Sequence, residues 1–148
     1  MFHIILFEPE IPPNTGNIIR LSVNTGSELH LIKPLGFSVD EKSLRRAGMD
    51  YIKKTDFNIW ESLNDCLKRI NYKSVYSIST KGQKIYSDLN YEKDDAFIFG
   101  PETKGLPQKI IDQYDSITIP MKSAGRSINL ANAVSIIVYE AWRQQKFI

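Results

Sequence analysis

Apolar and polar residues alternate along the chain in blocks that predict strands and helices in turn. Residues 2–7 form a short apolar run that is typical of a buried strand. A loop over residues 8–17, stiffened by three prolines, precedes a short helix that begins at Ile18 and ends near Gly26. Residues 29–33 predict a second strand. This order of strand, helix and strand favours a parallel sheet.

The rest of the chain continues the alternation. Asn58 is followed three residues later by Glu61, which indicates a capping box and predicts a helix from Asn58 to Ile70. Residues 84–95 are polar and predict an irregular segment. Further strands are expected over residues 75–79, 96–99 and 116–119, and further helices over 40–47, 108–113 and from 129 onward. About five strands alternating with helices predict an α/β fold, a mostly parallel sheet flanked by helices in a single domain of residues 1–148.

The longest helical pattern of apolar residues lies near the C-terminus. Its stripe consists of residues 130, 133, 134, 137, 138, 141 and 142. Asn129 is expected to cap the start of this helix through its side-chain oxygen. Ile136 and Tyr139 are apolar beside the stripe, so we expect the helix to be buried on more than one side. A loop that leads into such a helix offers free amides to a polar ligand, although it is equally compatible with a plain core helix.

Composition narrows the class of protein. The 148 residues are 42% hydrophobic and 24% charged, which fits a soluble globular protein with one sizeable core. The net charge of +2 neither requires nor excludes nucleic acid. No apolar run reaches membrane-spanning length and the N-terminus lacks signal-peptide features, so we expect a cytoplasmic protein without a membrane partner. The single cysteine, Cys66, excludes an internal disulfide, and its place in a helical pattern predicts burial.

Three loops are the candidates for a ligand site. They are rich in Gly, Pro and Asn, and they leave the carboxyl ends of predicted strands at residues 8–17, 100–107 and 120–129. Ligands of parallel α/β sheets bind at these strand ends. Neither a dinucleotide-binding nor a phosphate-binding glycine motif is present, and no nucleophile elbow occurs. The two histidines, His3 and His30, lie in separate strand-like runs, so we expect no metal site.

The same loops carry motifs that resemble a known family. The motifs span Glu8–Arg20, Phe99–Pro107, and Ile119–Met121 together with Arg126–Val134, with further matches at Leu44–Tyr51 and Tyr139–Arg143. Over essentially the whole chain, the sequence is similar to the SPOUT superfamily of knotted RNA methyltransferases, and within it to the small tRNA (cytidine/uridine-34) 2′-O-methyltransferases. The resemblance implies a SPOUT fold with a C-terminal trefoil knot, S-adenosyl-L-methionine as cofactor, and a homodimer. It also implies that the substrate is the anticodon stem-loop of certain tRNAs, and leucine isoacceptors are the expected ones.

The resemblance assigns five residues to the cofactor: Ile78, Gly100, Ile119, Ser127 and Leu130. Gly100 would let the cofactor pass close to the backbone, and its structural alternative is a turn that ends the strand. Ser127 would contact the methionine end of the cofactor, or cap a helix. The three apolar residues would surround the adenine and ribose, although each taken alone also suits a core.

Catalysis is assigned by the same resemblance to Asn14, Arg20 and Asn129. A ribose 2′-hydroxyl must lose its proton as it attacks the methyl group. Because a guanidinium essentially never gives up its proton, we expect Arg20 to hold an RNA phosphate and to stabilise the developing alkoxide. A surface helix charge is the alternative for Arg20. Asn14 would hold the loop or the ribose, and Asn129 would lie near the reacting centre as well as cap its helix.

RNA contacts are expected from one acidic and several basic residues. Glu102 would order its loop or contact substrate. The basic candidates for phosphate contacts are Arg45, Arg46, Lys53, Lys54, Lys122 and Arg126. Affinity that depends on such contacts falls with salt. Two alternatives to methylation of nucleotide 34 stay open: a methyltransferase for another tRNA or rRNA ribose, and a catalytically silent RNA-binding module.

Overall fold

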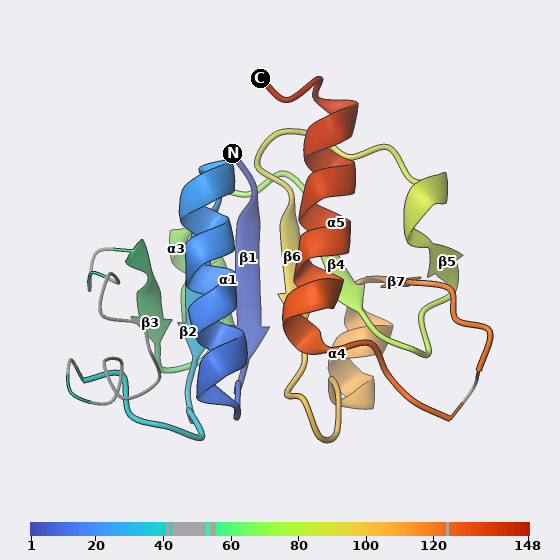
Figure 1. Cartoon of the computed structure of the whole chain (residues 1–148). Helices are drawn as coiled ribbons and strands as arrows, with labels where there is room; N and C mark the ends of the chain where they lie inside the picture. Colours follow the sequence, from blue (N-terminus) through green and yellow to red (C-terminus); the bar gives the residue numbers. More distant parts are fainter. Residues whose placement is uncertain (41, 43–52, 54–55, 124) are drawn as a thin grey trace.

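The computed structural model of the protein describes residues 1–40, 42, 53, 56–123 and 125–148. Within them, seven strands form one sheet in the order β3-β2-β1-β6-β4-β7-β5, and all neighbouring strands are parallel (Figure 1). The strands are β1 His3–Phe7, β2 Glu28–Ile32, β3 Asn58–Trp60, β4 Val75–Ile78, β5 Lys84–Ile85, β6 Ala96–Phe99 and β7 Asp115–Thr118. The helices are α1 Pro12–Thr25, α3 Leu63–Arg69, α4 Gln108–Gln113 and α5 Leu130–Gln144, with a 3-10 turn η2 at Tyr86–Asp88. The predicted α/β class with a parallel sheet is confirmed.

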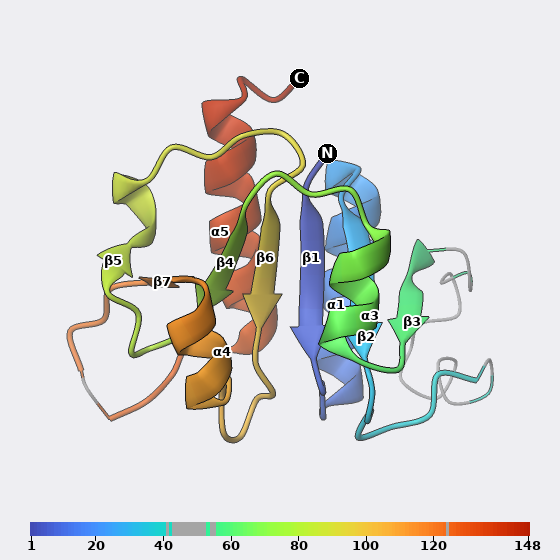
Figure 2. The same ribbon diagram turned by 180° about the vertical axis from the view of Figure 1, so that it is seen from behind.

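Among the described residues, two helices cover each face of the sheet. Helices α1 and α5 lie side by side on one face, and α3 and α4 lie on the other (Figures 1 and 2). Successive residues of a strand point to opposite faces, so Ile4 and Leu6 pack beneath α1 and α5 while Ile5 packs with the α3 and α4 side. Both faces are therefore buried, which explains why the strands read as continuous apolar runs.

Helix α1 begins earlier than the sequence predicts. Residues 8–17 were expected to be loop, but Pro12 already lies in the first turn of the helix. Proline is favoured there because its fixed φ suits the helix and its missing N–H would be unpaired anyway. The helix ends as predicted, at Gly26, whose φ of 66° is left-handed. Asn14 and Gly16 consequently belong to a helix start and not to a free loop.

The predicted helix from Asn58 to Ile70 is wrong in its first part. Asn58–Trp60 pairs with β2 as strand β3, and the helix starts only after Ser62, whose side chain accepts a hydrogen bond from the Asp65 amide at 3.1 Å. Pairing with β2 outweighs the local capping pattern. The segment expected to be irregular contains the two-residue strand β5 and the turn η2. The helix expected over residues 40–47 falls almost entirely outside the described residues.

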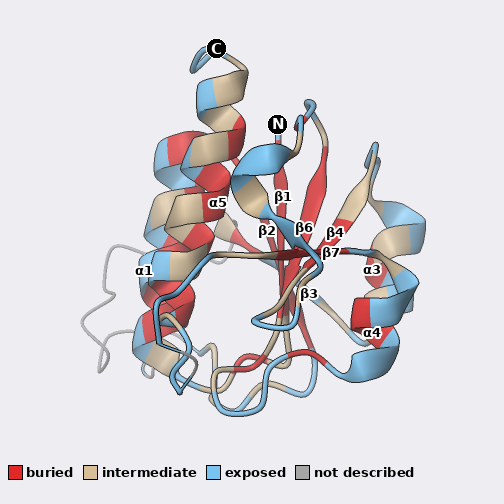
Figure 3. Cartoon of the chain, turned by 90° about the vertical axis from the view of Figure 1, so that its right-hand side faces the viewer, coloured by how far each residue is buried: buried red, intermediate tan, exposed pale blue. Residues whose placement is uncertain are grey.

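The C-terminal helix confirms its predicted start and stripe. The Asn129 side chain accepts a hydrogen bond from the Asn132 amide at 3.3 Å, as an N-cap residue does. Its buried residues include Val134, Ile137 and Val138, and Cys66 of α3 is fully buried as expected. Tyr139, however, is 44% exposed in the single chain. Helix α5 carries both buried and exposed residues along its length (Figure 3). No helix among the described residues is long and apolar enough to cross a membrane. The trefoil knot stays a prediction.

Candidate active site at the carboxyl end of the sheet

A cavity of about 410 Å³ lies at the carboxyl ends of β4, β6 and β7. This volume falls within the range of small-molecule sites. The structure brings all five predicted cofactor residues into its wall: Ile78, Gly100, Ile119, Ser127 and Leu130. Asn14, Glu102 and Asn129 line it too. Because parallel strands end on the same side of the sheet, segments that are far apart in the sequence meet here.

Apolar side chains form the floor of this cavity. Phe99 at the end of β6 is buried, and Leu130 opens helix α5 with a buried side chain. Ile78 and Ile119 are partly buried and pack against the same core. Hydroxyl groups of Ser79, Thr80 and Ser127 come from the loops above them. Such a wall suits a ligand with a flat apolar part and a few polar groups.

Gly100 is required by the path of its own loop. A side-chain Cβ at this position would lie 2.3 Å from the Leu106 nitrogen and 2.5 Å from the carbonyl carbon of Gly105. Backbone atoms cannot give way as the end of a flexible side chain can. The expected strand-ending turn therefore accounts for this glycine without any ligand, although Gly100 also lines the cavity. Gly105 has a φ of 66°, a backbone conformation that favours glycine.

Glu102 joins the second loop to the start of helix α1. Its carboxylate accepts hydrogen bonds from the backbone N–H groups of Glu10 at 2.8 Å and Ile11 at 3.2 Å. Ile11 is the N-cap residue of α1 and makes no side-chain cap, and Glu102 adds a negative charge at this helix start by binding the amides of Ile11 and the residue before it. Thr103 adds a hydrogen bond to the Glu10 carboxylate at 2.7 Å. The first alternative predicted for Glu102, ordering the loop, thus has a direct geometric basis.

Two asparagines join the starts of helices α1 and α5. The Asn129 side-chain amide donates to the Asn14 side-chain oxygen at 3.0 Å, while the Asn129 oxygen caps α5. Asn14 is 8% exposed. Two of the three residues predicted to be catalytic are therefore held in fixed positions at the rim of the cavity. Their hydrogen bonds fix the relative placement of the first and third loops.

None of the basic candidates that the structure describes, Lys53 among them, lines the cavity. Arg20 is exposed on α1 and lies six positions after Asn14, which places the two about 120° apart around the helix axis. Lys122 and Arg126 are exposed on the loop before α5. None of these three cations lines the cavity. Arg45, Arg46 and Lys54 lie outside the described residues, so the structure does not place them.

Sequence reasoning missed part of the wall. Residues Ser79, Thr80 and Lys81 follow β4 and line the cavity, as does Thr103. The position of residues 79–81 directly after a predicted strand was the available signal, because that strand lies between β6 and β7 in the sheet. The segment lacks the Gly, Pro and Asn enrichment that marked the other three loops.

Comparison with known proteins agrees with this geometry. Residues 1–139 match the SpoU rRNA Methylase family. A tRNA (cytidine(34)-2′-O)-methyltransferase of Escherichia coli K12 is 50% identical over 147 residues, which cover 97% of this chain and 94% of that protein. A solved structure titled for the 2-OH methylation of C/U34 on tRNA has a TM-score of 0.91 and 37% identity, and covers 99% of this chain and 97% of its own.

A more distant structure shares the fold. The SpoU methyltransferase AviRb from Streptomyces viridochromogenes, in complex with AdoMet, has a TM-score of 0.82 at 23% identity and covers 97% of this chain and 57% of that one. The family match spans nearly the whole chain, and the sheet and helices have the arrangement of solved SpoU methyltransferases. The chain therefore belongs to the SpoU rRNA methylase family.

Proposed function

We propose that this protein transfers a methyl group from S-adenosyl-L-methionine to the ribose 2′-hydroxyl of nucleotide 34, a cytidine or modified uridine, in certain tRNAs. The observation that carries the proposal is the cavity whose wall holds all five expected cofactor residues. Relatives named for this reaction, at 46–51% identity over 97% or more of the chain, support the choice of substrate. Leucine isoacceptors remain the expected tRNAs.

The cavity fits the proposed cofactor in its chemistry. Ile78, Ile119 and Leu130 offer apolar surface for the adenine and ribose, and Ser127 offers a hydroxyl for the polar methionine end. When bound, S-adenosyl-L-methionine supplies an electrophilic methyl group on a sulfonium. Phe99 and Leu130 are both buried, so the floor of the cavity offers the cofactor an apolar surface.

The catalytic task of the protein is to bring a ribose hydroxyl to this site and to stabilise its negative charge. Asn14 and Asn129 lie at the rim and are already oriented by their mutual hydrogen bond. Arg20 would bind an RNA phosphate and stabilise the forming alkoxide, with a phosphate oxygen or a water taking the proton. Glu102 would act as a positioning residue, because it fixes the start of the helix that carries both Asn14 and Arg20.

RNA binding would depend on cations around the cavity mouth. Lys122 and Arg126 are exposed on the loop that supplies Ser127, and Arg45 and Arg46 are further candidates. Contacts of this type release counterions from the RNA, so tRNA affinity is expected to fall steeply with salt. Cytoplasm, where tRNA is available, is the proposed location.

A homodimer is part of the proposal. Val23 of α1 is 59% exposed, and Tyr139 and Phe147 at the C-terminal helix are also exposed. A second copy would cover this surface, as the nearly all-round apolar pattern of α5 predicts. Arg20 does not line the cavity of its own chain, so a neighbouring subunit could bring its Arg20 to the cavity instead.

The test is methyl transfer from labelled S-adenosyl-L-methionine to total tRNA from a strain lacking this gene, followed by mapping of the labelled nucleotide. We expect a 2′-O-methyl group at position 34. Label at another ribose would overturn the substrate and keep the chemistry. Absence of label, with cofactor binding and tRNA binding both measurable, would favour the silent RNA-binding module.

A further inference from the structure

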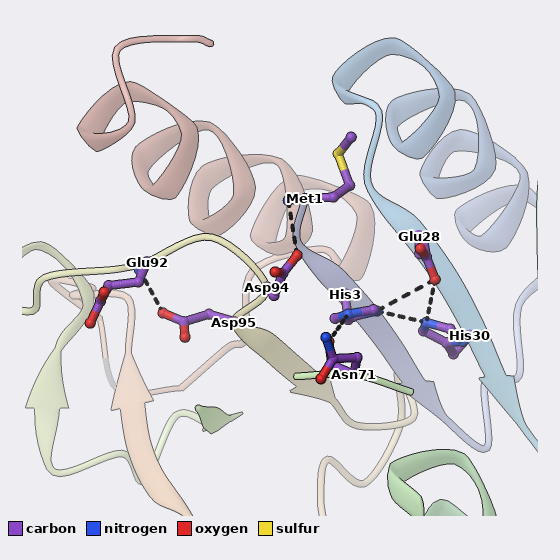
Figure 4. Close-up of polar contacts among 8 residues, drawn as sticks. All are labelled: Met1, His3, Glu28, His30, Asn71, Glu92, Asp94 and Asp95. Atoms are coloured by element: carbon purple, nitrogen blue, oxygen red, sulfur yellow. Dashed lines mark hydrogen bonds and ion pairs between the residues drawn. The ribbon is translucent and has the colours of Figure 1, made fainter. Parts of the chain in front are cut away.

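Two histidines and a glutamate meet at the amino end of the sheet, opposite the cavity (Figure 4). Parallel pairing places Glu28, the first residue of β2, beside His3, the first residue of β1. His30 follows two residues later on the same face of β2. The His3 Nδ1 and His30 Nε2 atoms are 3.1 Å apart, and a Glu28 carboxylate oxygen lies 3.7 Å from the first and 3.8 Å from the second.

The hydrogen bonds around these rings determine where their protons are. The Trp60 indole can only donate, so its 3.1 Å contact makes His30 Nδ1 an acceptor. In a neutral ring His30 Nε2 then carries the proton and donates to His3 Nδ1. His3 Nε2 in turn donates to the Asn71 carbonyl at 3.0 Å. Both rings therefore carry their proton on Nε2.

This arrangement leaves His3 prepared as a metal ligand. Its Nδ1 carries a lone pair, and its Nε2–H is held by a backbone carbonyl, as is usual for histidines that bind metals. Both rings are nearly fully buried, while the Glu28 side chain is exposed.

We propose that His3 Nδ1, His30 Nε2 and the Glu28 carboxylate form a binding site for a divalent transition metal, with Zn²⁺ as the expected ion. Two imidazoles and one carboxylate are a known ligand set for zinc. Ligands about 2.0–2.1 Å from a tetrahedral ion are about 3.3–3.4 Å from one another. The observed separations of 3.1, 3.7 and 3.8 Å need only small side-chain movements to reach that geometry. A water would complete the coordination.

Metal binding has one defined internal cost. His30 must move its proton from Nε2 to Nδ1, with no net gain or loss of protons, and Trp60 must turn away because two N–H donors would otherwise face each other. Trp60 is partly exposed on the edge strand β3, and Arg69 lies over its ring, so turning the indole also breaks this contact. The three proposed ligands line a surface pocket. Its other charged residues, Arg69 and Asp94, have opposite charges.

The site is distinct from the proposed methyltransferase site, because none of its three ligands lines the cavity at the other end of the strands. A bound ion would join the first residues of β1 and β2. We therefore expect it to raise the melting temperature of the protein and to leave methyl transfer unchanged. This proposal replaces the expectation, drawn from the sequence, that His3 and His30 form no metal-binding group.

The test uses the full-length chain without a histidine tag. The chain has two histidines and one cysteine, and Cys66 is fully buried, so imidazole-bound Co²⁺ must use this pair. We expect Co²⁺ to give a visible absorption band that Zn²⁺ abolishes, with one ion bound per chain. Glu28→Gln, at an exposed position, should weaken Zn²⁺ binding at least about tenfold. Glu61→Gln, which removes a carboxylate outside the group that is even more exposed than Glu28, should leave Zn²⁺ binding unchanged.

Nitrogen NMR of the two imidazoles gives an independent readout. On addition of Zn²⁺, His30 should change to the Nδ1–H form while His3 keeps its Nε2–H. Trp60→Phe removes the competing donor and should tighten Zn²⁺ binding, whereas loss of a merely structural contact would not. Absence of Zn²⁺ binding at micromolar concentrations, or equal affinity in the Glu28→Gln variant, would show that these residues form only a hydrogen-bond chain.

Discussion

The two ends of the sheet are both rich in polar side chains, but they are built in different ways. At the carboxyl end, three loops contribute hydrogen bonds that span more than 90 positions of sequence, such as Glu102 to the Glu10 amide. At the amino end, a chain of hydrogen bonds runs from Trp60 through His30 and His3 to Asn71. The loops of the first end surround a cavity, whereas the second end contains buried rings. We therefore assign the reaction to the carboxyl end and a stabilising role, joining β1 to β2, to the amino end.

The largest expected effect concerns the carboxyl end. Arg20→Ala should lower the rate of methyl transfer to tRNA by about 10²–10³-fold, because a charge that stabilises the alkoxide would be lost. Cofactor binding, measured by calorimetry, should be unchanged, since Arg20 does not line the cavity. Arg20→Lys should retain part of the rate. A fully active Arg20→Ala enzyme would contradict the assigned role.

The glycines of the second loop offer a matched pair. Gly100→Ala should destabilise the protein by about 1–3 kcal/mol and reduce cofactor affinity, because its Cβ would overlap the backbone of Gly105 and Leu106. Gly105→Ala meets no atom within 4 Å and carries only the strain of a positive φ, so its cost should be smaller, about 1 kcal/mol. Urea unfolding would measure both values. Equal costs would argue against crowding at Gly100.

The connection between the first and second loops should also be measurable. Glu102→Gln removes the charge that binds two backbone amides and should cost about 1–2 kcal/mol of stability, with a lower rate of methyl transfer. Thr103→Val removes one exposed hydrogen bond to Glu10 and should cost less. If Glu102→Gln changed tRNA affinity alone, with stability and rate intact, Glu102 would contact RNA instead.

At the amino end we expect an effect on stability without one on catalysis. In metal-free protein, Trp60→Phe removes the donor to His30 Nδ1 and should cost about 1 kcal/mol, measured by thermal unfolding. Methyl transfer at saturating substrate should be that of the wild type. A large loss of rate with an intact fold would show that the two ends of the sheet are coupled.

The smallest expected effect concerns the reactivity of Cys66, a buried residue of helix α3. Burial raises the pKa of the Cys66 thiol to about 12, so at pH 8 almost no thiolate is present. A thiol reagent should leave the native protein unmodified over hours, and should react at once in denaturant. Rapid reaction of the native protein would mean that α3 opens away from the sheet.

Sequence predicted one end of the sheet far better than the other. The family resemblance assigned Ile78, Gly100 and Ser127 to one cofactor site, and all three line one cavity because parallel strands end on the same side of the sheet. Helix α5 and its Asn129 cap followed from a clear period. The group of His3, Glu28 and His30 could not be found this way, since it depends on the register of β1 with β2. Strand β3 was missed because its three residues gain their pairing only from β2.

The division of roles between the two ends can be tested by NMR on isotope-labelled protein titrated with S-adenosyl-L-methionine. We expect the backbone signals of Ile78, Gly100, Ile119, Ser127 and Leu130 to move, because these residues line the cavity. The signals of His3 and His30 should stay in place. Shifts confined to the histidine end, or an absence of shifts around Gly100, would contradict the assignment of the cavity as the cofactor site.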